Sequence, residues 1–342
     1  MSYTLAPVSD PAEVQALLES EGLQLDPHLD YTCAVFDEGG TPIATGSCYG
    51  NTLRCFAVDG AHRGEGLLST VLTHLCEVEC QRGNLRLFLY TKGKAAPLFG
   101  DLGFYEIART GERLVFMENR RNGFSNAVAQ LAATRRPGVS GALVMNANPF
   151  TLGHQYLAEQ AAAACDTLHL FVVSEDVSLV PFSVRRELVA KGVAHLPNVI
   201  LHDSGPYIIS NATFPSYFLG DEASVAECHA RLDLAVFAKI AAALGITRRY
   251  VGEEPASQIT ALYNRVMAQE LPKAGVACVV LPRKTAPDGQ IISASTARRL
   301  LQEGAWDALA EFLPPASLAY FRSPAAAPVL AQLRQAKSVV HC

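Results

Sequence analysis

A threonine and a histidine stand three residues apart in the stretch Asn146–Gln155, which reads NANPFTLGHQ. The apolar run Gly141–Met145 before it predicts a strand, and the alanine-rich run Tyr156–Cys165 after it predicts a helix. A strand, a tight turn and a helix start together bring free backbone N–H groups and the positive end of a helix dipole to one place. Thr151 and His154 would lie there, where a hydroxyl and an imidazole can stabilise charge on phosphate oxygens. The stretch therefore indicates an anion site suited to a triphosphate.

A second candidate stretch is Ile291–Arg298, which reads IISASTAR. Ser293 and Ser295 are expected to cap a helix whose first amides can bind phosphates. Arg298, one turn into that helix, would add a charged fork for the same oxygens. Taken alone, the pattern is equally compatible with a plain helix cap and a surface arginine.

A third candidate lies at Tyr250–Pro255, where an apolar run ends in the acidic pair Glu253 and Glu254. Either carboxylate could contact a nucleotide or orient His154. A polar strand end without a function is the equally plausible alternative.

The elements that must position these residues alternate from Ser140 onward. Apolar strands separated by helices predict a parallel sheet covered on both faces, with ligands beyond the carboxyl ends of the strands. The expected strands are Ala142–Met145, Leu168–Ser174, Val199–His202, Arg249–Gly252 and Ala277–Pro282, and the expected helices are Gly153–Cys165, Ser183–His195, Ala223–Leu244 and Ser257–Leu271, with a last helix from about Ser295.

A separate α/β domain is expected over residues 1–118. It would contain a hairpin around the turn Asp37–Gly40, because the two flanking segments alternate in polarity. We expect a polar linker at 119–138, with a helix at Ala127–Thr134, then a catalytic domain at 139–325 and a C-terminal tail at 326–342. The expected elements of the first domain are helices at Glu13–Glu21, Ser69–Arg82 and Ala96–Leu102 and strands at Tyr31–Phe36, Ile43–Tyr49, Leu53–Val58 and Leu85–Thr91.

Composition excludes several classes of protein. A length of 342 residues suffices for two full cores, and a net charge of −5 gives no reason to expect nucleic acid. No apolar run is long enough for a membrane span, and the N-terminus has no secretion signal. The nine cysteines have no paired spacing, so with no signal the expected compartment is the reducing cytoplasm. No protein metal ligand is predicted.

The segment Val58–Leu68, followed by a predicted helix, resembles the pyrophosphate loop of the GNAT acetyltransferase fold. Arg63, Gly66 and Leu68 occupy the positions of its R/Q-x-x-G-x-G/A motif. Leu68 replaces a small residue there, so this resemblance supports the fold better than acetyl-CoA chemistry. A fold that only binds a partner is the alternative.

The spacing Thr-x-Gly-His, with Ser-x-Ser-x-x-Arg further on, resembles the paired motifs of the nucleotidyltransferase superfamily. The resemblance implies a Rossmann-like domain that binds ATP with Mg²⁺ and transfers adenylyl without a protein nucleophile. His154, Thr151 and Arg298 would then be catalytic. The implied ATP-binding residues are Asn148, Phe150, Gly153, His154, Gly252, Glu253, Ser293, Ser295 and Arg298.

Nearly the whole chain resembles the citrate lyase ligase family. The most specific segment is Tyr207–Leu219, which reads YIISNATFPSYFL, and Gly220 stands where that family leads us to expect a lysine. The resemblance implies that ATP and acetate form acetyl-AMP and pyrophosphate. The acetyl group would then pass to the phosphoribosyl-dephospho-CoA thiol of the citrate lyase acyl carrier protein, which activates the lyase.

Hydroxyl groups in this long segment could bind acetate or the carrier's prosthetic arm; Tyr207, Ser210 and Thr213 are the candidates. Arg185 and Arg186 could reach phosphates or the carrier, although a solvated helix face is the commoner role for such a pair. Two other functions stay open: a transferase that adenylylates a phosphate ester, and an acetyl-CoA-binding or carrier-docking module without turnover.

Overall fold

The computed structural model describes residues 3–174, 178–208, 214, 217, 222–253 and 258–335. Contacts within the chain group it into two compact units. The first comprises Met1–Ala127 and Thr213–Ala235, and the second comprises Val128–Ala212 and Val236–Cys342. The division after Ala127 falls inside the stretch expected to be a linker. Thr213–Ala235 belongs to the first unit although it lies within the range 139–325 expected for the second domain. The two units are therefore not consecutive in the sequence, as the expected domains were.

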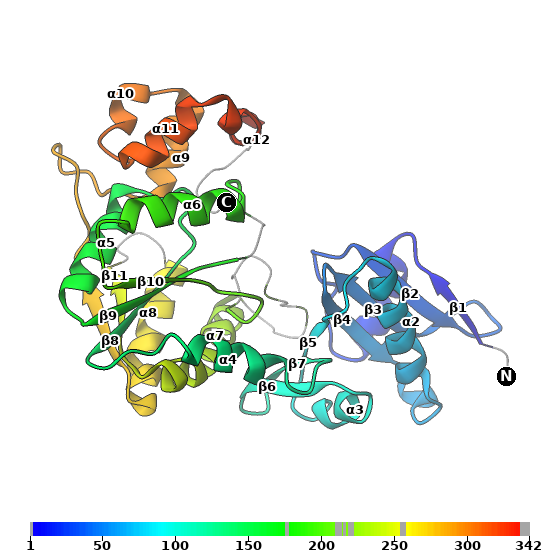
Figure 1. The fold of residues 1–342 in the computed structure, drawn as a ribbon. Helices are drawn as coiled ribbons and strands as arrows, with labels where there is room; N and C mark the ends of the chain where they lie inside the picture. Colours follow the sequence, from blue (N-terminus) through cyan, green and yellow to red (C-terminus); the bar gives the residue numbers. More distant parts are fainter. Residues whose placement is uncertain are drawn as a thin grey trace. The chain divides into compact units, whose positions relative to one another are not determined.

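The first unit is built on a seven-stranded sheet in the order β1-β2-β3-β4-β5-β7-β6 (Figure 1). Its strands are β1 (Thr4–Pro7), β2 (Tyr31–Phe36), β3 (Pro42–Tyr49), β4 (Thr52–Val58), β5 (Phe88–Thr91), β6 (Tyr105–Thr110) and β7 (Leu114–Glu118). Its helical segments are η1 (Pro11–Val14), α1 (Gln15–Ser20), η2 (Gly60–His62), α2 (Leu67–Gln81) and α3 (Ala96–Asp101), followed by α4 (Gly123–Ala132) at the division between the units.

Neighbouring strands of this sheet pair antiparallel, except that β4 and β5 run parallel. The predicted β2–β3 hairpin is confirmed, and α2 covers the face of β2, β3 and β4 with Val71, Leu72 and Leu75 buried. The predictions missed β1, β6 and β7. The strand β7 is buried at every position, so it has no alternating polarity, and β6 is an edge strand with a half-exposed pattern.

The second unit contains a five-stranded sheet in which every pair is parallel, in the order β10-β9-β8-β11-β12. The strands are β8 (Ser140–Met145), β9 (Thr167–Val172), β10 (Val199–Asp203), β11 (Ile246–Gly252) and β12 (Ala277–Leu281). All five predicted strands exist, and the expected Rossmann-like parallel sheet is confirmed. The strand order reverses between β8 and β11, which are neighbours, so the carboxyl ends of these two strands flank the switch point.

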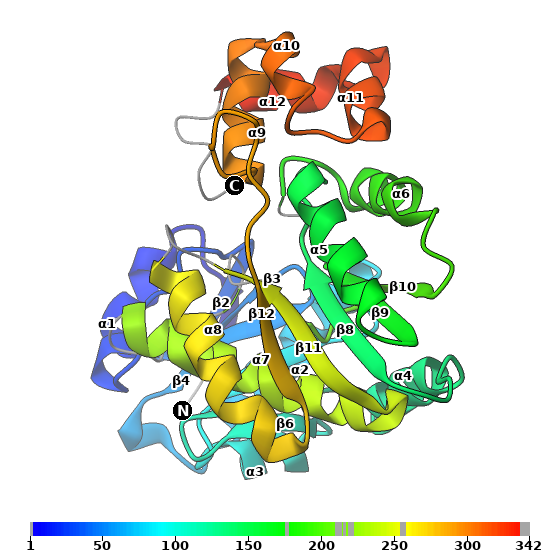
Figure 2. The same ribbon diagram turned by 90° about the vertical axis from the view of Figure 1, so that its left-hand side faces the viewer.

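Helices cover both faces of this sheet (Figure 2). One face carries α5 (Leu152–Ala163) and α6 (Phe182–Val193), while α7 (Glu222–Leu244) and α8 (Gln258–Glu270) lie on the other. Ala158, Ala161 and Ala162 of α5 are buried against the strands, because small side chains allow the helix to approach the sheet closely. The remaining helical segments are η3 (Leu271–Ala274), α9 (Ala294–Glu303), α10 (Trp306–Leu309), α11 (Pro315–Arg322), η4 (Pro324–Ala326) and α12 (Ala327–Gln335).

The C-terminal helices have their own apolar cluster, which includes Leu300, Leu301, Phe312 and Phe321. Val329 and Leu333 of α12 are buried in the same cluster. The first half of the stretch expected as a tail is therefore a packed helix.

Across the described ranges, every helix is too short or too polar to cross a lipid bilayer.

Candidate functional site

The turn between β8 and α5 is closed by a local hydrogen-bond exchange between Thr151 and His154. Thr151 is the N-cap of α5, and its side-chain oxygen accepts from the backbone N–H of His154 at 3.3 Å. In return, the backbone N–H of Thr151 donates to Nδ1 of His154 at 3.1 Å. This is a capping box in which histidine takes the place of the usual glutamate. The Thr-x-x-His spacing is thus explained by helix capping as well as by chemistry.

The same exchange determines which nitrogen of His154 carries the proton. A backbone N–H can only donate, so Nδ1 must be the unprotonated acceptor and Nε2 the N–H donor. Burial and the positive charges of Arg283 and Arg298 lower the pKa of His154 to about 4. The imidazole is therefore neutral at physiological pH and can donate a hydrogen bond to a phosphate oxygen through Nε2.

The second motif lies directly against the first. A Cβ atom added to Gly153 would come within 2.7 Å of the carbonyl oxygen of Ile292, so only glycine allows this approach. Ile292 precedes Ser293, the N-cap of α9, whose hydroxyl accepts from the backbone N–H of Thr296 at 3.1 Å. The N-terminal ends of α5 and α9 are therefore neighbours, and within them the backbone N–H groups of Leu152, His154 and Thr296 donate to Phe312, Thr151 and Ser293.

The predicted site residues Asn148 and Phe150 have structural contacts that hold the turn. The Asn148 side-chain oxygen accepts from the backbone N–H of Val180 at 3.1 Å. Phe150 is fully buried, stacks on the His154 ring at 5.9 Å between centroids, and its carbonyl accepts from Ser317 Oγ at 2.9 Å. Both residues fix the backbone that carries Thr151 and His154.

Arg298 is buried, with 4% exposure, and its Nη1 donates to the carbonyl oxygen of Asn148 at 2.6 Å. The arginine predicted as a phosphate ligand thus ties the second motif to the first. Gly252 and Glu253 stand at the end of β11, next to Leu281 of β12. Ser295 lies in the first turn of α9 and is partly buried.

The predicted substrate residues are only partly within the described ranges. Tyr207 lies in the turn that follows β10 and is buried, at 3% exposure. Ser210 and Thr213, with Glu254 and Gly220, lie outside the described residues.

Arg185 shows that the expectation of a solvated helix face was wrong for that residue. It is completely buried, and its guanidinium donates to the carbonyl oxygens of Val180, Asn146 and Val173 at 2.8–2.9 Å. It also donates to the side-chain oxygen of Asn146 at 2.7 Å. Arg186, the next residue, does lie on the exposed face and pairs with Asp203 at 2.5 Å.

Sequence reasoning also missed Arg283, whose Nε donates to the carbonyl oxygen of Glu253. A usable signal was present: Arg283 and Lys284 follow the fifth strand at its carboxyl end, where ligands bind in such sheets.

The described residues contain one cluster of three side chains that could ligate a metal ion. Among the described residues, the three-member cluster of potential metal ligands is Asp30, Cys48 and Glu79 in the first unit. Arg82 already pairs there with Asp30 at 2.6 Å and with Glu79 at 2.8 Å, so the cluster is an ion-pair network. A Mg²⁺ ion bound with a nucleotide takes many of its ligands from phosphates and water.

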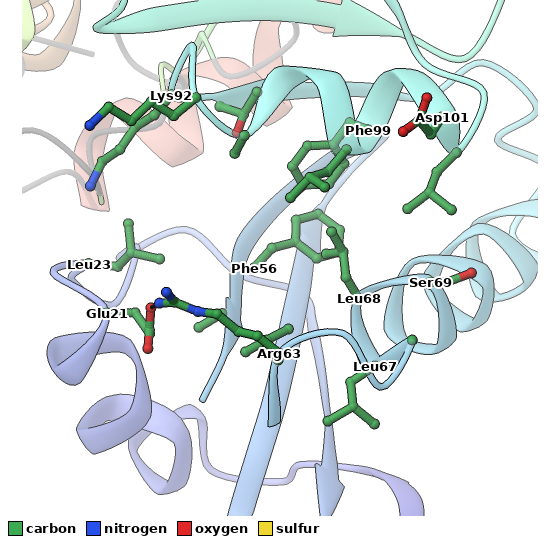
Figure 3. A pocket seen from close by; sticks show the side chains of 18 of the residues that line it. Glu21, Leu23, Phe56, Arg63, Leu67, Leu68, Ser69, Lys92, Phe99 and Asp101 are labelled. Atoms are coloured by element: carbon green, nitrogen blue, oxygen red, sulfur yellow. Dashed lines mark hydrogen bonds and ion pairs between the residues drawn. The ribbon is translucent and has the colours of Figure 1, made fainter. Parts of the chain in front are cut away.

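A separate cavity of about 790 Å³ lies in the first unit (Figure 3). It is lined by the loop Arg63–Leu67, by Leu68 and by Lys92, and Figure 3 shows Phe56, Leu68 and Phe99 beside one another. Gly64 and Gly66 have φ values of +87° and +78°, which the loop requires. The Arg63 guanidinium pairs with Glu21. The loop motif favoured the fold over acetyl-CoA chemistry, and that judgement on the chemistry stays a prediction.

Tyr217 fills the gap between the two parallel strands of the first unit. Strands β4 and β5 pair only at Thr52–Phe88 and Leu53–Leu89 and then separate. The Tyr217 hydroxyl donates to the carbonyl oxygen of Tyr90 at 3.0 Å and is hydrogen-bonded by the backbone of Cys55. Its ring packs in the apolar cluster with Ala57. A residue of the segment predicted for substrate binding is thus part of the first unit's core.

Fold and site together define a class of protein. A parallel sheet with a reversal of strand order, and with two adjoining helix N-termini and His154 beyond it, is the arrangement of an α/β domain of the nucleotidyltransferase type.

Comparisons with known proteins narrow this class. Residues 140–321 match the family model described as the citrate lyase ligase C-terminal domain. A citrate (pro-3S)-lyase ligase from Klebsiella pneumoniae is 43% identical over 81% of this chain and 83% of its own length. The ligases of the same name from Haemophilus influenzae and Escherichia coli are 39% and 37% identical, over 90% and 91% of this chain and 94% and 90% of theirs. The chain belongs to the citrate lyase ligase family, so the resemblance seen in its motifs is confirmed.

Solved structures similar to about a third of the chain include acetyltransferases. A GNAT-family acetyltransferase from Staphylococcus aureus Mu50 is 13% identical, with a TM-score of 0.30, over 34% of this chain and 98% of its own. The ribosomal-protein-S18-alanine N-acetyltransferase from Escherichia coli is 19% identical, with a TM-score of 0.28, over 34% and 92% of the two chains.

Proposed function

We propose that this protein is an AMP-forming ligase that activates acetate with ATP and transfers the acetyl group to the prosthetic thiol of the citrate lyase acyl carrier protein. The observation that carries the proposal is the juxtaposition of the α5 and α9 N-termini at Gly153 and Ile292, beside a neutral histidine. Relatives that are 37–43% identical over most of the chain carry the name of this ligase, which supports the same activity.

In the first step, an acetate oxygen attacks the α-phosphorus of ATP, a P–O bond forms, and the bond to the β-phosphate oxygen breaks. The products are acetyl-AMP and pyrophosphate. Nε2–H of His154 donates a hydrogen bond to an α-phosphate oxygen as charge develops on it, and the helix amides stabilise the other phosphates. Mg²⁺, carried by the phosphates, adds charge neutralisation when bound.

In the second step, the carrier thiol loses its proton to solvent and attacks the acetyl carbonyl carbon. A C–S bond forms, the C–O bond to AMP breaks, and AMP leaves. Tyr207, Ser210 and Thr213 are proposed to contact acetate or the prosthetic arm. The compartment proposed for this reaction is the cytoplasm.

The test is ATP–pyrophosphate exchange by the purified full chain, with and without acetate. We expect exchange only when acetate is present, and a loss of about 10²–10³-fold in His154→Ala, which removes one preorganised donor. Arg298→Ala should also reduce exchange. The proposal fails if exchange depends on a phosphate ester instead of acetate, or if His154→Ala retains the wild-type rate.

A further inference from the structure

The three cationic side chains near His154 have different environments. Arg298 is buried, and its Nη1 is committed to the Asn148 carbonyl at 2.6 Å. This bond links α9 to the residue that begins the Asn148–Thr151 turn. The guanidinium therefore serves the geometry of the turn, whatever else it contacts.

Arg283 lies outside both sequence motifs, just after β12, and is partly exposed. Its Nε donates to the Glu253 carbonyl, at the end of β11. A Cβ atom added to Gly252 would lie 3.5 Å from the same Nε, so the side chain rests on the glycine backbone. These contacts place Arg283 at the carboxyl ends of β11 and β12, on the same edge of the sheet as the turn that carries His154.

The next residue holds this segment against both helix starts. Lys284 Nζ lies 5.9 Å from the centroid of the Tyr156 ring in α5. The Lys284 carbonyl accepts from the backbone N–H of Ile292 at 3.0 Å, one residue before the α9 cap. Arg283 and Lys284 therefore bring two positive charges to the junction of α5 and α9.

The pKa of His154 also indicates that Arg283 lies near this histidine. After burial, Arg283 is the larger of the two charge effects that lower the pKa of His154, and Arg298 is the smaller. Arg283 therefore lies close enough to His154 for its positive charge to act on the imidazole.

We propose that Arg283 is a further residue that binds the β- and γ-phosphates of ATP and the leaving pyrophosphate, and that Arg298 also positions the Asn148–Thr151 turn. A guanidinium can bind two phosphate oxygens at once, and Arg283 is partly exposed at the edge of the sheet where the negative charge of the leaving pyrophosphate would develop. This inference rests on the proposed function, because it assigns residues within that site.

The test is binding of inorganic pyrophosphate to the full chain by calorimetry, in the absence of acetate. Arg283→Gln should weaken binding and raise the KM for ATP by about tenfold to a hundredfold. Arg299→Gln is the matched control, because it removes one positive charge from an exposed α9 residue that pairs with Glu303. It should bind pyrophosphate as wild type does. The affinity of Arg283→Lys for pyrophosphate should lie between that of wild type and that of Arg283→Gln.

Two further measurements separate binding from folding. Arg283→Gln should unfold at the wild-type temperature, whereas Arg298→Gln should unfold lower, because it leaves the Asn148 carbonyl without its donor. Histidine NMR titration should show the pKa of His154 rising from about 4 in Arg283→Gln, since a neighbouring positive charge has been removed.

The inference is overturned if wild type fails to bind pyrophosphate, or if Arg283→Gln binds it normally. Its failure is distinct from failure of the proposed function. Acetate-dependent exchange with normal Arg283→Gln binding would refute only the inference. Exchange without acetate, with pyrophosphate binding lost in Arg283→Gln, would refute only the assignment of acetate.

Discussion

Gly153 is the position at which one added carbon atom would separate the two halves of the site. Its absent side chain permits contact with the Ile292 carbonyl, and a Cβ would stand 2.7 Å from that backbone oxygen. Backbone atoms cannot rotate away as the end of a long side chain can. The motif's glycine is therefore explained by close approach between α5 and the residue before α9.

We expect Gly153→Ala to destabilise the protein by about 1–3 kcal/mol and to reduce ATP–pyrophosphate exchange more than stability alone would explain. Urea unfolding and exchange rates measure the two effects. Gly100→Ala is the control, because nothing lies within 4 Å of a Cβ there and the residue is in α3. It should be neutral or stabilising by about 0.5–1 kcal/mol. Wild-type exchange in Gly153→Ala would contradict this account of the glycine.

At the scale of elements, the loop after β8 depends on a side chain from α6. Arg185 supplies donors to four oxygen atoms, two of them on Asn146. It joins the end of β8 to the end of β9, since Val173 follows β9 directly. The turn that carries Thr151 and His154 is therefore anchored from outside its own sequence.

Arg185→Met should lower stability by about 3–5 kcal/mol, because it leaves several buried acceptors unsatisfied. Arg186→Met is the matched control, because it makes the same substitution at the next residue, which forms an exposed ion pair with Asp203. That variant should change stability by less than about 1 kcal/mol. Thermal and urea unfolding of both variants give the comparison, and equal effects would show that burial of Arg185 does not matter.

At the scale of the whole molecule, stability should depend on pH through histidines that are neutral in the fold. His169 Nδ1 and His202 Nε2 lie 2.9 Å apart and are buried. Among the described residues, His169 Nε2 has no hydrogen-bond partner, so a proton there would be buried without an acceptor. Burial lowers the pKa of each to about 4.

The pKa of each histidine is lower in the folded protein than the unfolded value of 6.5, so as the pH falls the unfolded chain is protonated before the folded one. Stability should therefore be greatest above pH 6.5 and fall as the pH drops toward 4, by on the order of 3 kcal/mol for each histidine. Urea unfolding from pH 7.5 to 4.5 measures the slope. His169→Leu with His202→Leu should reduce the slope and leave the part that His154 contributes, while His195→Gln, at an exposed histidine, should leave the slope unchanged. An unchanged slope in the double variant would refute this origin.

Local sequence patterns were sufficient to predict much of the fold of this protein and its family. The capping box of Thr151 and His154 involves residues three apart, so its spacing is visible in the sequence. The apolar strands and the alternation of strand and helix predicted the parallel sheet, because burial on both faces requires continuous apolar runs. Family membership followed from the same short motifs.

Contacts between distant residues could not be predicted in this way. The bonds from Arg185 to Asn146 and from Arg298 to Asn148 join residues 39 and 150 positions apart. An arginine in a helix has the same local pattern whether it faces solvent or a buried carbonyl, so burial decides its role. Tyr217 acquires its place only when β4 and β5 lie on either side of it. The position of Arg283 after the fifth strand was visible in the sequence, but its contact with Glu253 arises only when β11 and β12 pair.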